Sequence, residues 1–394
     1  MNRRETAGQD RTVALHLHWI ITVRPWMNAW RYIFFSVPSS RGTRRKGTAM
    51  FSAMRKTTTT SRMRRLAVAA VALGGCLALA VPTGTAGAAP ADPVPTVFFG
   101  DSYTANYGIA PVNNQDNERG WCFQATQNYP AVATRSLAGK GITLDVQSDV
   151  SCGGALVEHF WTEQQLPFGA GRVPAQQDAL KEDTKLVVGG MGGNTLGFTS
   201  ILKQCSDELR KHPLLPGEPV DPDQPAGECR DFFASDDGKA WLDDRLQQVE
   251  WDLEQLLQRV SYFSPGAERV LVGYPRLVPE DTTKCLTPAP GQTEPPFADT
   301  PKDALPLLDQ IQKQLDDVMK KAAADDGADF VDLYDRTGNN TACDGADRGI
   351  GGLLETSKLD IFGQPLPWYA HPNEKGRDIQ AKHVTTKIEE VLNR

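Results

Sequence analysis

Short apolar runs alternate with longer helical patterns through residues 95–394 of this 394-residue chain. Apolar residues recur at three- and four-residue spacing over 241–260, 308–319 and 379–392, which is typical of amphipathic helices. Around these helices lie five short apolar runs, three of which run into a glycine: 96–99, 142–146, 185–189, 269–273 and 329–333. Short apolar strands that alternate with helices predict parallel βαβ units in an α/β domain.

Two stretches break this alternation. Residues 213–229 and 275–306 are rich in proline, glycine and acidic groups, and each carries at least one cysteine. We interpret them as long loops pinned by disulfides rather than as linkers between domains. No internal repeat is found, and a single domain over residues 89–394 fits the usual size of such folds.

The first 88 residues have a different character. Residues 1–53 show no sustained period, and we interpret them as the product of a misassigned start codon, with an unusually long leader as the alternative. Residues 54–88 predict a secretory signal peptide: a basic segment, a 16-residue apolar run and a small-residue cleavage site. The run is shorter than the roughly 20 residues of a membrane-spanning helix. Cys76 stands in a lipoprotein-like box, which leaves lipid anchoring as an alternative.

Removal of residues 1–88 changes the charge of the chain. That segment holds 14 of the 42 basic residues and 2 of the 49 acidic ones, which leaves 28 against 47 and a net charge of −19. Such a surface repels nucleic acid and anionic membranes, so we expect neither a nucleic-acid partner nor stable membrane insertion.

Six cysteines follow residue 88: Cys122, Cys152, Cys205, Cys229, Cys285 and Cys343. An even number in an exported chain predicts three disulfides, although spacing alone leaves their pairing open. No two of them form a Cys-x-x-Cys pair, so we expect no zinc site and no cofactor. The abundant acidic residues leave calcium binding undecided.

A serine becomes a nucleophile when a histidine takes its proton and amide donors hold the oxyanion. Ser102 follows the first strand, Cys152-Gly153-Gly154 follows the second and Asn194 follows the third. Because open α/β folds place their sites at the carboxyl ends of the strands, these residues are expected to meet at one edge. The tripeptide Gly100-Asp101-Ser102 alone is a weak signal, because it is as common in turns as in active sites.

Four histidines follow the predicted signal peptide. His159 lies among apolar residues and is expected to be packed or half-exposed, His212 lies in a proline-rich loop, and His383 belongs to the terminal helix. His371 differs because it stands in a short irregular segment directly before that helix. From such a segment it can reach a neighbouring strand end, and it is the candidate general base.

Taken together, these blocks resemble the SGNH (GDSL) hydrolases, with Gly100-Asp101-Ser102, Cys152-Gly153-Gly154, Gly190 to Asn194 and His371-Pro372-Asn373 in the family's order. The resemblance implies a three-layer α/β/α, flavodoxin-like fold with a central parallel sheet of about five strands. It implies Ser102 as nucleophile, His371 as base, and the Ser102 amide, the Gly154 amide and the Asn194 side chain as oxyanion donors. In secreted actinobacterial members, neighbouring cysteines pair, which implies Cys122–Cys152, Cys205–Cys229 and Cys285–Cys343.

The sequence departs from the family pattern at two positions. Thr195 replaces the acid of the third block, which leaves the Asn194 donor in place. Trp368 stands where the family has its triad acid, three residues before His371. Some secreted relatives use a main-chain carbonyl there, so we predict a Ser–His dyad oriented by the Trp368 carbonyl oxygen. Asp335 or Asp360 as orienting carboxylate is the alternative.

The resemblance implies a secreted, monomeric esterase or lipase that hydrolyses small-molecule or lipid esters through an acyl-enzyme. A polysaccharide acetylesterase of the same fold is one alternative. The other is a catalytically inactive extracellular binding protein, since a fold alone does not establish a function.

Overall fold

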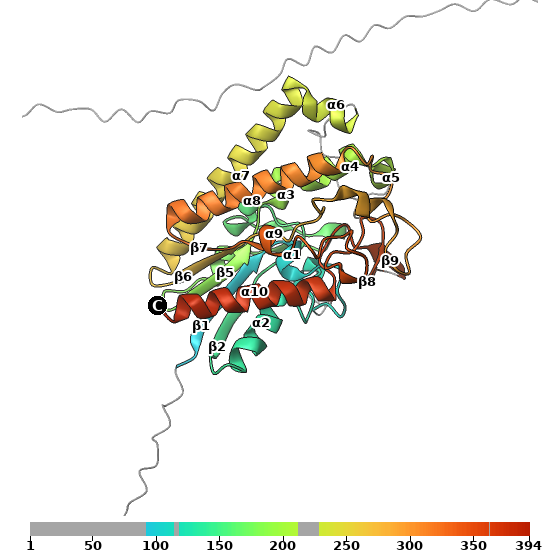
Figure 1. Cartoon of the computed structure of the whole chain (residues 1–394). Coiled ribbons are helices and arrows are strands. Elements are labelled where there is room, and N and C mark those ends of the chain that lie inside the picture. Colours follow the sequence, from blue (N-terminus) through green and yellow to red (C-terminus); the bar gives the residue numbers. More distant parts are fainter. Residues whose placement is uncertain (1–91, 114–117, 212–227, 362) are drawn as a thin grey trace, which may run out of the picture. The chain divides into compact units, whose positions relative to one another are not determined.

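The five apolar runs form one parallel sheet in the computed structural model of the chain (Figure 1). Its strands are β1 (Val94–Gly100), β2 (Leu144–Asp149), β5 (Leu186–Gly190), β6 (Glu268–Val272) and β7 (Asp329–Val331). They lie in the order β2-β1-β5-β6-β7. Counted along the chain, this is the 2-1-3-4-5 order of flavodoxin-like folds, so the predicted fold class is confirmed.

The structure describes residues 92–113, 118–211, 228–361 and 363–394, all within a unit that spans Gly84–Arg394. Several sequence predictions lie outside the described residues: the start extension 1–53, the signal peptide 54–88 with Cys76, His212 and most of the loop 213–229.

Helices cover both faces of the sheet and complete three layers (Figure 1). They are α2 (Tyr129–Ala138) and α10 (Glu374–Leu392) on one face, with α7 (Asp236–Phe263) and α8 (Leu305–Asp326) on the other. Successive side chains of β1 enter opposite layers: Phe98 packs in the α2/α10 layer, whereas Val97 and Phe99 pack in the α7/α8 layer. Burial on both faces explains why this strand reads as a continuous apolar run.

The remaining elements are short. The helices are α1 (Ser102–Ala105), α3 (Gly193–Leu196), α4 (Phe198–Cys205), α5 (Asp207–Lys211), α6 (Cys229–Ala234) and α9 (Leu333–Arg336), with 3₁₀ turns η1 (Glu118–Cys122), η2 (Val157–Phe160), η3 (Pro167–Gly169), η4 (Gln176–Ala179), η5 (Thr282–Leu286) and η6 (Gly345–Asp347). Two antiparallel pairs join β3 (Gln164–Gln165) to β4 (Arg172–Val173) and β8 (Thr356–Ile361) to β9 (Gln364–Pro367). The apolar pattern predicts none of these pieces.

Capping residues set the ends of the long helices beyond their apolar stripes. Ser235 accepts the N–H of Gly238 at 3.0 Å, so α7 begins before the predicted start at residue 241. Gly327, with φ of 72°, ends α8 in the left-handed conformation. Asn373 caps α10 by accepting the N–H of Gly376 at 3.0 Å, as the sequence suggests for a helix start.

Three disulfides hold the loops, and they are the pairs that the resemblance implies: Cys122–Cys152, Cys205–Cys229 and Cys285–Cys343. The second joins the end of α4 to the start of α6, and the third pins the loop 275–306 to the segment after α9.

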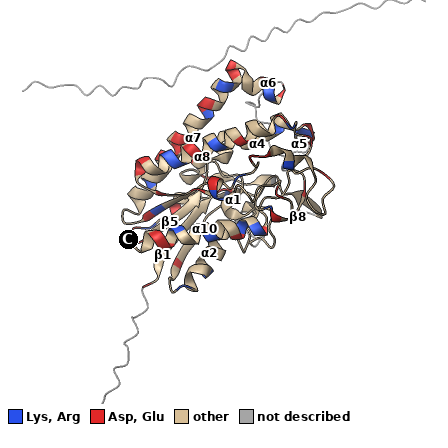
Figure 2. Ribbon diagram, in the orientation of Figure 1, with Lys and Arg blue, Asp and Glu red and all other residues tan. Residues whose placement is uncertain are grey.

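Acidic and basic residues are interspersed along α7, α8 and α10 (Figure 2). No helix in the described part of the chain has the length and hydrophobicity that a membrane crossing needs.

Candidate active site

The turn after β1 presents Ser102 at the carboxyl edge of the sheet. Gly100 has φ of 146°, and a Cβ there would lie 2.1 Å from Thr104 Oγ1, so this position requires glycine. Asp101 then caps α1 by accepting the N–H of Tyr103 at 2.9 Å. Ser102 becomes the first residue of that helix and is 8% exposed.

His371 lies beside Ser102 although 269 positions separate them. Its Nε2 is 2.7 Å from Ser102 Oγ. Its Nδ1 lies 2.9 Å from the carbonyl oxygen of Trp368 and 3.0 Å from that of Tyr369. A ring nitrogen between two acceptors carries the hydrogen, so Nε2 holds the lone pair that faces the serine hydroxyl.

The two carbonyl groups converge because the chain turns sharply at Tyr369 and Ala370. Their φ angles of 49° and 60° lie in the left-handed region, which non-glycine residues adopt only when the surroundings enforce it. The hydroxyl of Tyr103 donates to the carbonyl of Ala370 at 2.8 Å, and its ring lies 4.6 Å from the imidazole. Tyr103 therefore braces the turn that orients His371. No glycine marks this turn, so the sequence gives no sign of the second carbonyl.

Both alternative carboxylates belong to exposed residues. Asp335 lies on α9, where its N–H is bound by the side chain of Asp332 at 3.0 Å. Asp360 accepts the N–H of Gly363 at 2.7 Å in the turn of the β8–β9 pair. Within the described residues, the ring of His371 makes hydrogen bonds to Ser102 and to main-chain carbonyls and to no carboxylate.

Burial also sets the charge of the imidazole. It lowers the pKa of His371 to about 4, against the opposing effect of the two carbonyl acceptors. The ring is therefore neutral near neutral pH, which is the state in which a histidine can accept a proton.

Amide donors line the same cavity as Ser102. The N–H of Gly153 donates to the carbonyl of Cys122 at 2.8 Å, whereas the N–H of Gly154 has no acceptor in the described part of the chain. The side chain of Asn194 lies next to Gly154, because its Nδ2 donates to the carbonyl of Ala155 at 3.1 Å. The second hydrogen of that amide group remains for another acceptor. This arrangement favours Gly154 over Gly153 as a free donor.

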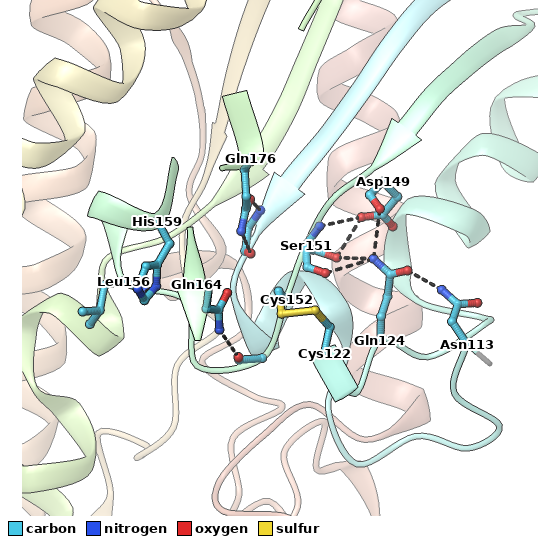
Figure 3. Close-up of a disulfide and its surroundings, with 12 residues drawn as sticks. Asn113, Cys122, Gln124, Asp149, Ser151, Cys152, Leu156, His159, Gln164 and Gln176 are labelled. Atoms are coloured by element: carbon cyan, nitrogen blue, oxygen red, sulfur yellow. Dashed lines mark hydrogen bonds between the residues drawn. A yellow bond between two sulfur atoms is a disulfide. The ribbon is translucent and has the colours of Figure 1, made fainter. Parts of the chain in front are cut away.

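Side-chain amides hold the loop that carries Gly154 (Figure 3). Gln124 Nε2 donates to the Ser151 Oγ at 2.8 Å, one residue before the Cys122–Cys152 disulfide. Gln164 Nε2 donates to the carbonyl of Gly153 at 2.7 Å. The disulfide and these glutamines fix the loop from both sides.

Gln176 holds the strand end that leads to Ser102 (Figure 3). Its Oε1 accepts the N–H of Gly100 at 2.8 Å, and its Nε2 donates to the carbonyl of the same glycine at 2.9 Å. Isolated glutamines in loops carry no sequence signal, so sequence reasoning misses this residue.

The other predicted polar residues have structural partners. Thr195 Oγ1 accepts the N–H of Val157 at 2.9 Å, so the residue that replaces the family acid holds η2. His159 Nδ1 accepts the N–H of Leu156 at 3.0 Å, and His383 lies on α10. Neither histidine makes a hydrogen bond to Ser102, whose hydroxyl bonds to His371.

Ser102, Gly154, Asn194 and His371 line one cavity of about 590 Å³. Most of its remaining wall is apolar and includes Phe198, Leu202, Leu209, Leu277, Leu315 and Leu353. The cavity therefore joins a small polar region, which contains the serine and histidine, to a larger apolar one.

Tyr274, two residues after the end of β6, is a further polar residue of the cavity wall that sequence reasoning misses. Its hydroxyl donates to Asp101 Oδ2 and accepts the N–H of Gly193 at 2.8 Å. Burial raises the pKa of Asp101 to about 6, and the hydrogen bond from Tyr274 opposes that rise.

Glu250, Glu254 and Asp325 form an acidic cluster on α7 and α8, away from the cavity. Their oxygens lie within 4.8 Å of one another. However, the ammonium group of Lys321 lies 2.6 Å from Glu250 and 2.7 Å from Asp325, which supplies the positive charge that these carboxylates need.

The chain is similar in sequence to known proteins. The sequence pattern of the GDSL-like Lipase/Acylhydrolase family matches residues 98–379. A protein named Esterase from Streptomyces scabiei is 75% identical over 345 residues, which cover 88% of this chain and all of that protein. Lipase 2 of Streptomyces coelicolor is 31% identical over 330 residues, covering 82% of this chain and 96% of that one.

Among solved structures, an extracellular lipase from Streptomyces rimosus superimposes with a TM-score of 0.50 at 19% identity, covering 75% of this chain and 99% of that one. At this identity the likeness concerns the fold. The family pattern and the two sequence relatives go further: this chain belongs to the GDSL-like lipase/acylhydrolase family.

Proposed function

We propose that this protein is a secreted serine hydrolase of carboxylic esters. Ser102 is its nucleophile, His371 its general base and later acid, and the carbonyl oxygen of Trp368 orients the imidazole. The observation that carries the proposal is the 2.7 Å distance between Ser102 Oγ and His371 Nε2, in a cavity that also presents Gly154 and Asn194. The Esterase relative at 75% identity supports the reaction class.

The mechanism passes through an acyl-enzyme. Ser102 Oγ attacks the ester carbonyl carbon while its proton passes to His371 Nε2. The N–H groups of Ser102 and Gly154 and the Asn194 side chain hold the resulting oxyanion. When the tetrahedral species collapses, the histidine gives its proton to the oxygen of the departing alcohol. Water then repeats the sequence: it loses a proton to His371, attacks the acyl carbon, and the proton returns to the Ser102 oxygen as the carboxylic acid leaves.

Main-chain carbonyls can replace the usual carboxylate because the imidazole is buried and bound at Nδ1 by two acceptors. They fix the tautomer and the ring plane, which are the main tasks of the third triad member. A neutral carbonyl stabilises the imidazolium less than a carboxylate does. The transition state, in which the imidazolium forms, is therefore stabilised less than in a triad with a carboxylate.

Secretion is part of the proposal. Three disulfides persist in oxidising compartments and are rare in the cytosol. Residues 54–88 supply the basic, apolar and small-residue segments of a signal peptide.

The apolar part of the cavity supports an acyl chain longer than acetyl as the preferred substrate. With p-nitrophenyl esters from acetate to laurate, we expect kcat/KM to rise with chain length, by up to about fourfold per buried methylene, until the cavity is filled. Release of p-nitrophenol measures the rate. A maximum at acetate would instead favour the polysaccharide acetylesterase, and no hydrolysis of any ester would leave the inactive binding protein.

The dyad predicts which substitutions are tolerated. Trp368→Phe should keep most of kcat, because the main-chain carbonyl remains, although the smaller ring in this buried position should lower Tm. Asp335→Asn and Asp360→Asn should keep both kcat and Tm, since both side chains are exposed. Steady-state kinetics with thermal melts measures all three. A loss of kcat above tenfold in either asparagine variant, with the fold intact, would show that a carboxylate orients His371.

A further inference from the structure

One chain of hydrogen bonds ties together the carboxyl ends of β1, β5 and β6. Tyr274 follows β6, and its hydroxyl donates to Asp101 Oδ2 in the turn after β1. The phenol oxygen of Tyr274 also accepts the N–H of Gly193, 2.8 Å away in the turn after β5. Asp101 Oδ1 in turn accepts the N–H of Tyr103 at 2.9 Å. The two turns joined in this way carry Ser102 and Asn194.

The directions of these bonds are fixed by chemistry. A main-chain N–H can only donate, so the phenol oxygen must accept from Gly193 and its one hydrogen must go to the carboxylate. A phenol that donates to an ionised carboxylate is a stronger acceptor, which strengthens its bond to Gly193. Asp101 thereby stabilises the turn before Asn194 through the phenol of Tyr274, without contacting that turn itself.

The surroundings leave the phenol little freedom. Tyr274 is 7% exposed, and its ring meets the Tyr103 ring edge-on with centroids 4.9 Å apart. A Cβ at residue 193 would lie 3.3 Å from Tyr274 Cζ and Oη, so glycine permits this close approach. Gly193 is also the first residue of the short helix α3, so its N–H has no acceptor within that helix.

We propose that Tyr274 is a positioning residue for ester hydrolysis: its phenol, held by Asp101, fixes the turn at Gly193 so that the Asn194 side chain reaches the oxyanion. The inference rests on the proposed function, because it assigns Asn194 the role of an oxyanion donor. Tyr274 itself takes no proton from the substrate.

The first test is Tyr274→Phe, with Tyr334→Phe as a matched control. Tyr334 is likewise buried and donates to a carboxylate, Asp309, at 2.9 Å, but it does not line the cavity. An oxyanion donor acts only in the transition state, so Tyr274→Phe should lower kcat about 10- to 10²-fold with KM unchanged. Tyr334→Phe should leave both constants as they are. Equal kcat in the two variants would overturn the inference.

The second test asks whether Tyr274 acts through Asn194. In an Asn194→Ala background, Tyr274→Phe should cost less than twofold, because the group that it positions is gone. If the two single losses multiplied in full, the effect of Tyr274 would be independent of Asn194 and merely structural, which would overturn the inference.

A further variant, Asp101→Asn, tests the carboxylate that holds the phenol. Its amide oxygen keeps the cap to Tyr103, while its NH₂ group meets the phenol as a donor, so a loss of kcat like that of Tyr274→Phe is expected.

The pH profile gives a readout that simple loss of packing would not move. The ionisable side chains that interact with Asp101 in the described residues are the phenols of Tyr274, Tyr103 and Tyr129. With a pKa of about 6, Asp101 is protonated as the pH falls through that value, and the bond from the phenol weakens. Wild-type kcat/KM should decrease as the pH falls below about 6. In Tyr274→Phe, kcat/KM should decrease only as His371 becomes protonated, near pH 4. The same acid limb in both proteins contradicts the inference.

The outcomes separate the inference from the proposed function. Wild-type protein without ester hydrolysis, or a fully active Ser102→Ala variant, refutes the proposed function whatever Tyr274 does. An active wild type in which Tyr274→Phe behaves like Tyr334→Phe refutes the positioning role alone.

Discussion

Replacement of Ser102 by alanine is expected to lower kcat for p-nitrophenyl butyrate by at least about 10⁴-fold while the fold is retained. The hydroxyl is the only group of the proposed dyad that can form the acyl-enzyme, and His371 cannot replace it as nucleophile at the same site. The amide donors and the cavity should sustain only the residual rate that substrate binding and oxyanion stabilisation provide. Spectrophotometric assays with purified protein measure the loss, and circular dichroism verifies the fold.

Two controls give this result its meaning. His371→Ala should cost a similar factor, and the double variant should be no worse than either single one, because the two groups act as a unit. Ser136→Ala, at an exposed serine on α2, should leave kcat unchanged. If Ser102→Ala kept more than a tenth of the wild-type rate, another nucleophile would have to be sought.

The second large effect is expected at Asn194. Asn194→Ala should lower kcat by about 10²–10³-fold with KM nearly unchanged, as for loss of one oxyanion donor in other acyl-transfer sites. The reason is geometric: Nδ2 already donates to Ala155 at 3.1 Å, so the side chain is held in place before the oxyanion forms.

Asn194→Asp is the matched variant, because it keeps the size of the side chain and removes the donor. It should lose at least as much activity as alanine, since a carboxylate repels the oxyanion. A rise in KM with kcat preserved, in either variant, would mean that Asn194 binds the substrate rather than the transition state.

The fold could be predicted where local pattern and global structure agree. The inner strands β1 and β5 are short apolar runs because helices bury both faces of the sheet there, as Phe98 and Phe99 of β1 show. The apolar pattern does not predict the short helix α2, because this helix buries only four side chains, one of them Pro130. The β8–β9 pair was also beyond it, because prolines at 365 and 367 argue against a strand.

The candidate site divides in the same way. Ser102, Gly154 and Asn194 could be predicted because each follows a strand of a parallel sheet, and His371 because it precedes the last helix. Tyr274 and Gln176 could not, since their partners lie 173 and 76 positions away and no periodicity records such pairs. The position of the Tyr369 carbonyl beside His371 depends on a left-handed turn, which no glycine in the sequence indicates.

The most direct test of the account is covalent labelling of the nucleophile. A fluorophosphonate reacts with an activated serine and stays attached as an analogue of the tetrahedral intermediate. After digestion, mass spectrometry should find the phosphonyl group on the peptide that contains Ser102, and labelling should vanish in both Ser102→Ala and His371→Ala. A label on another residue, or wild-type protein that hydrolyses esters without being labelled or inhibited, would contradict the Ser102–His371 dyad.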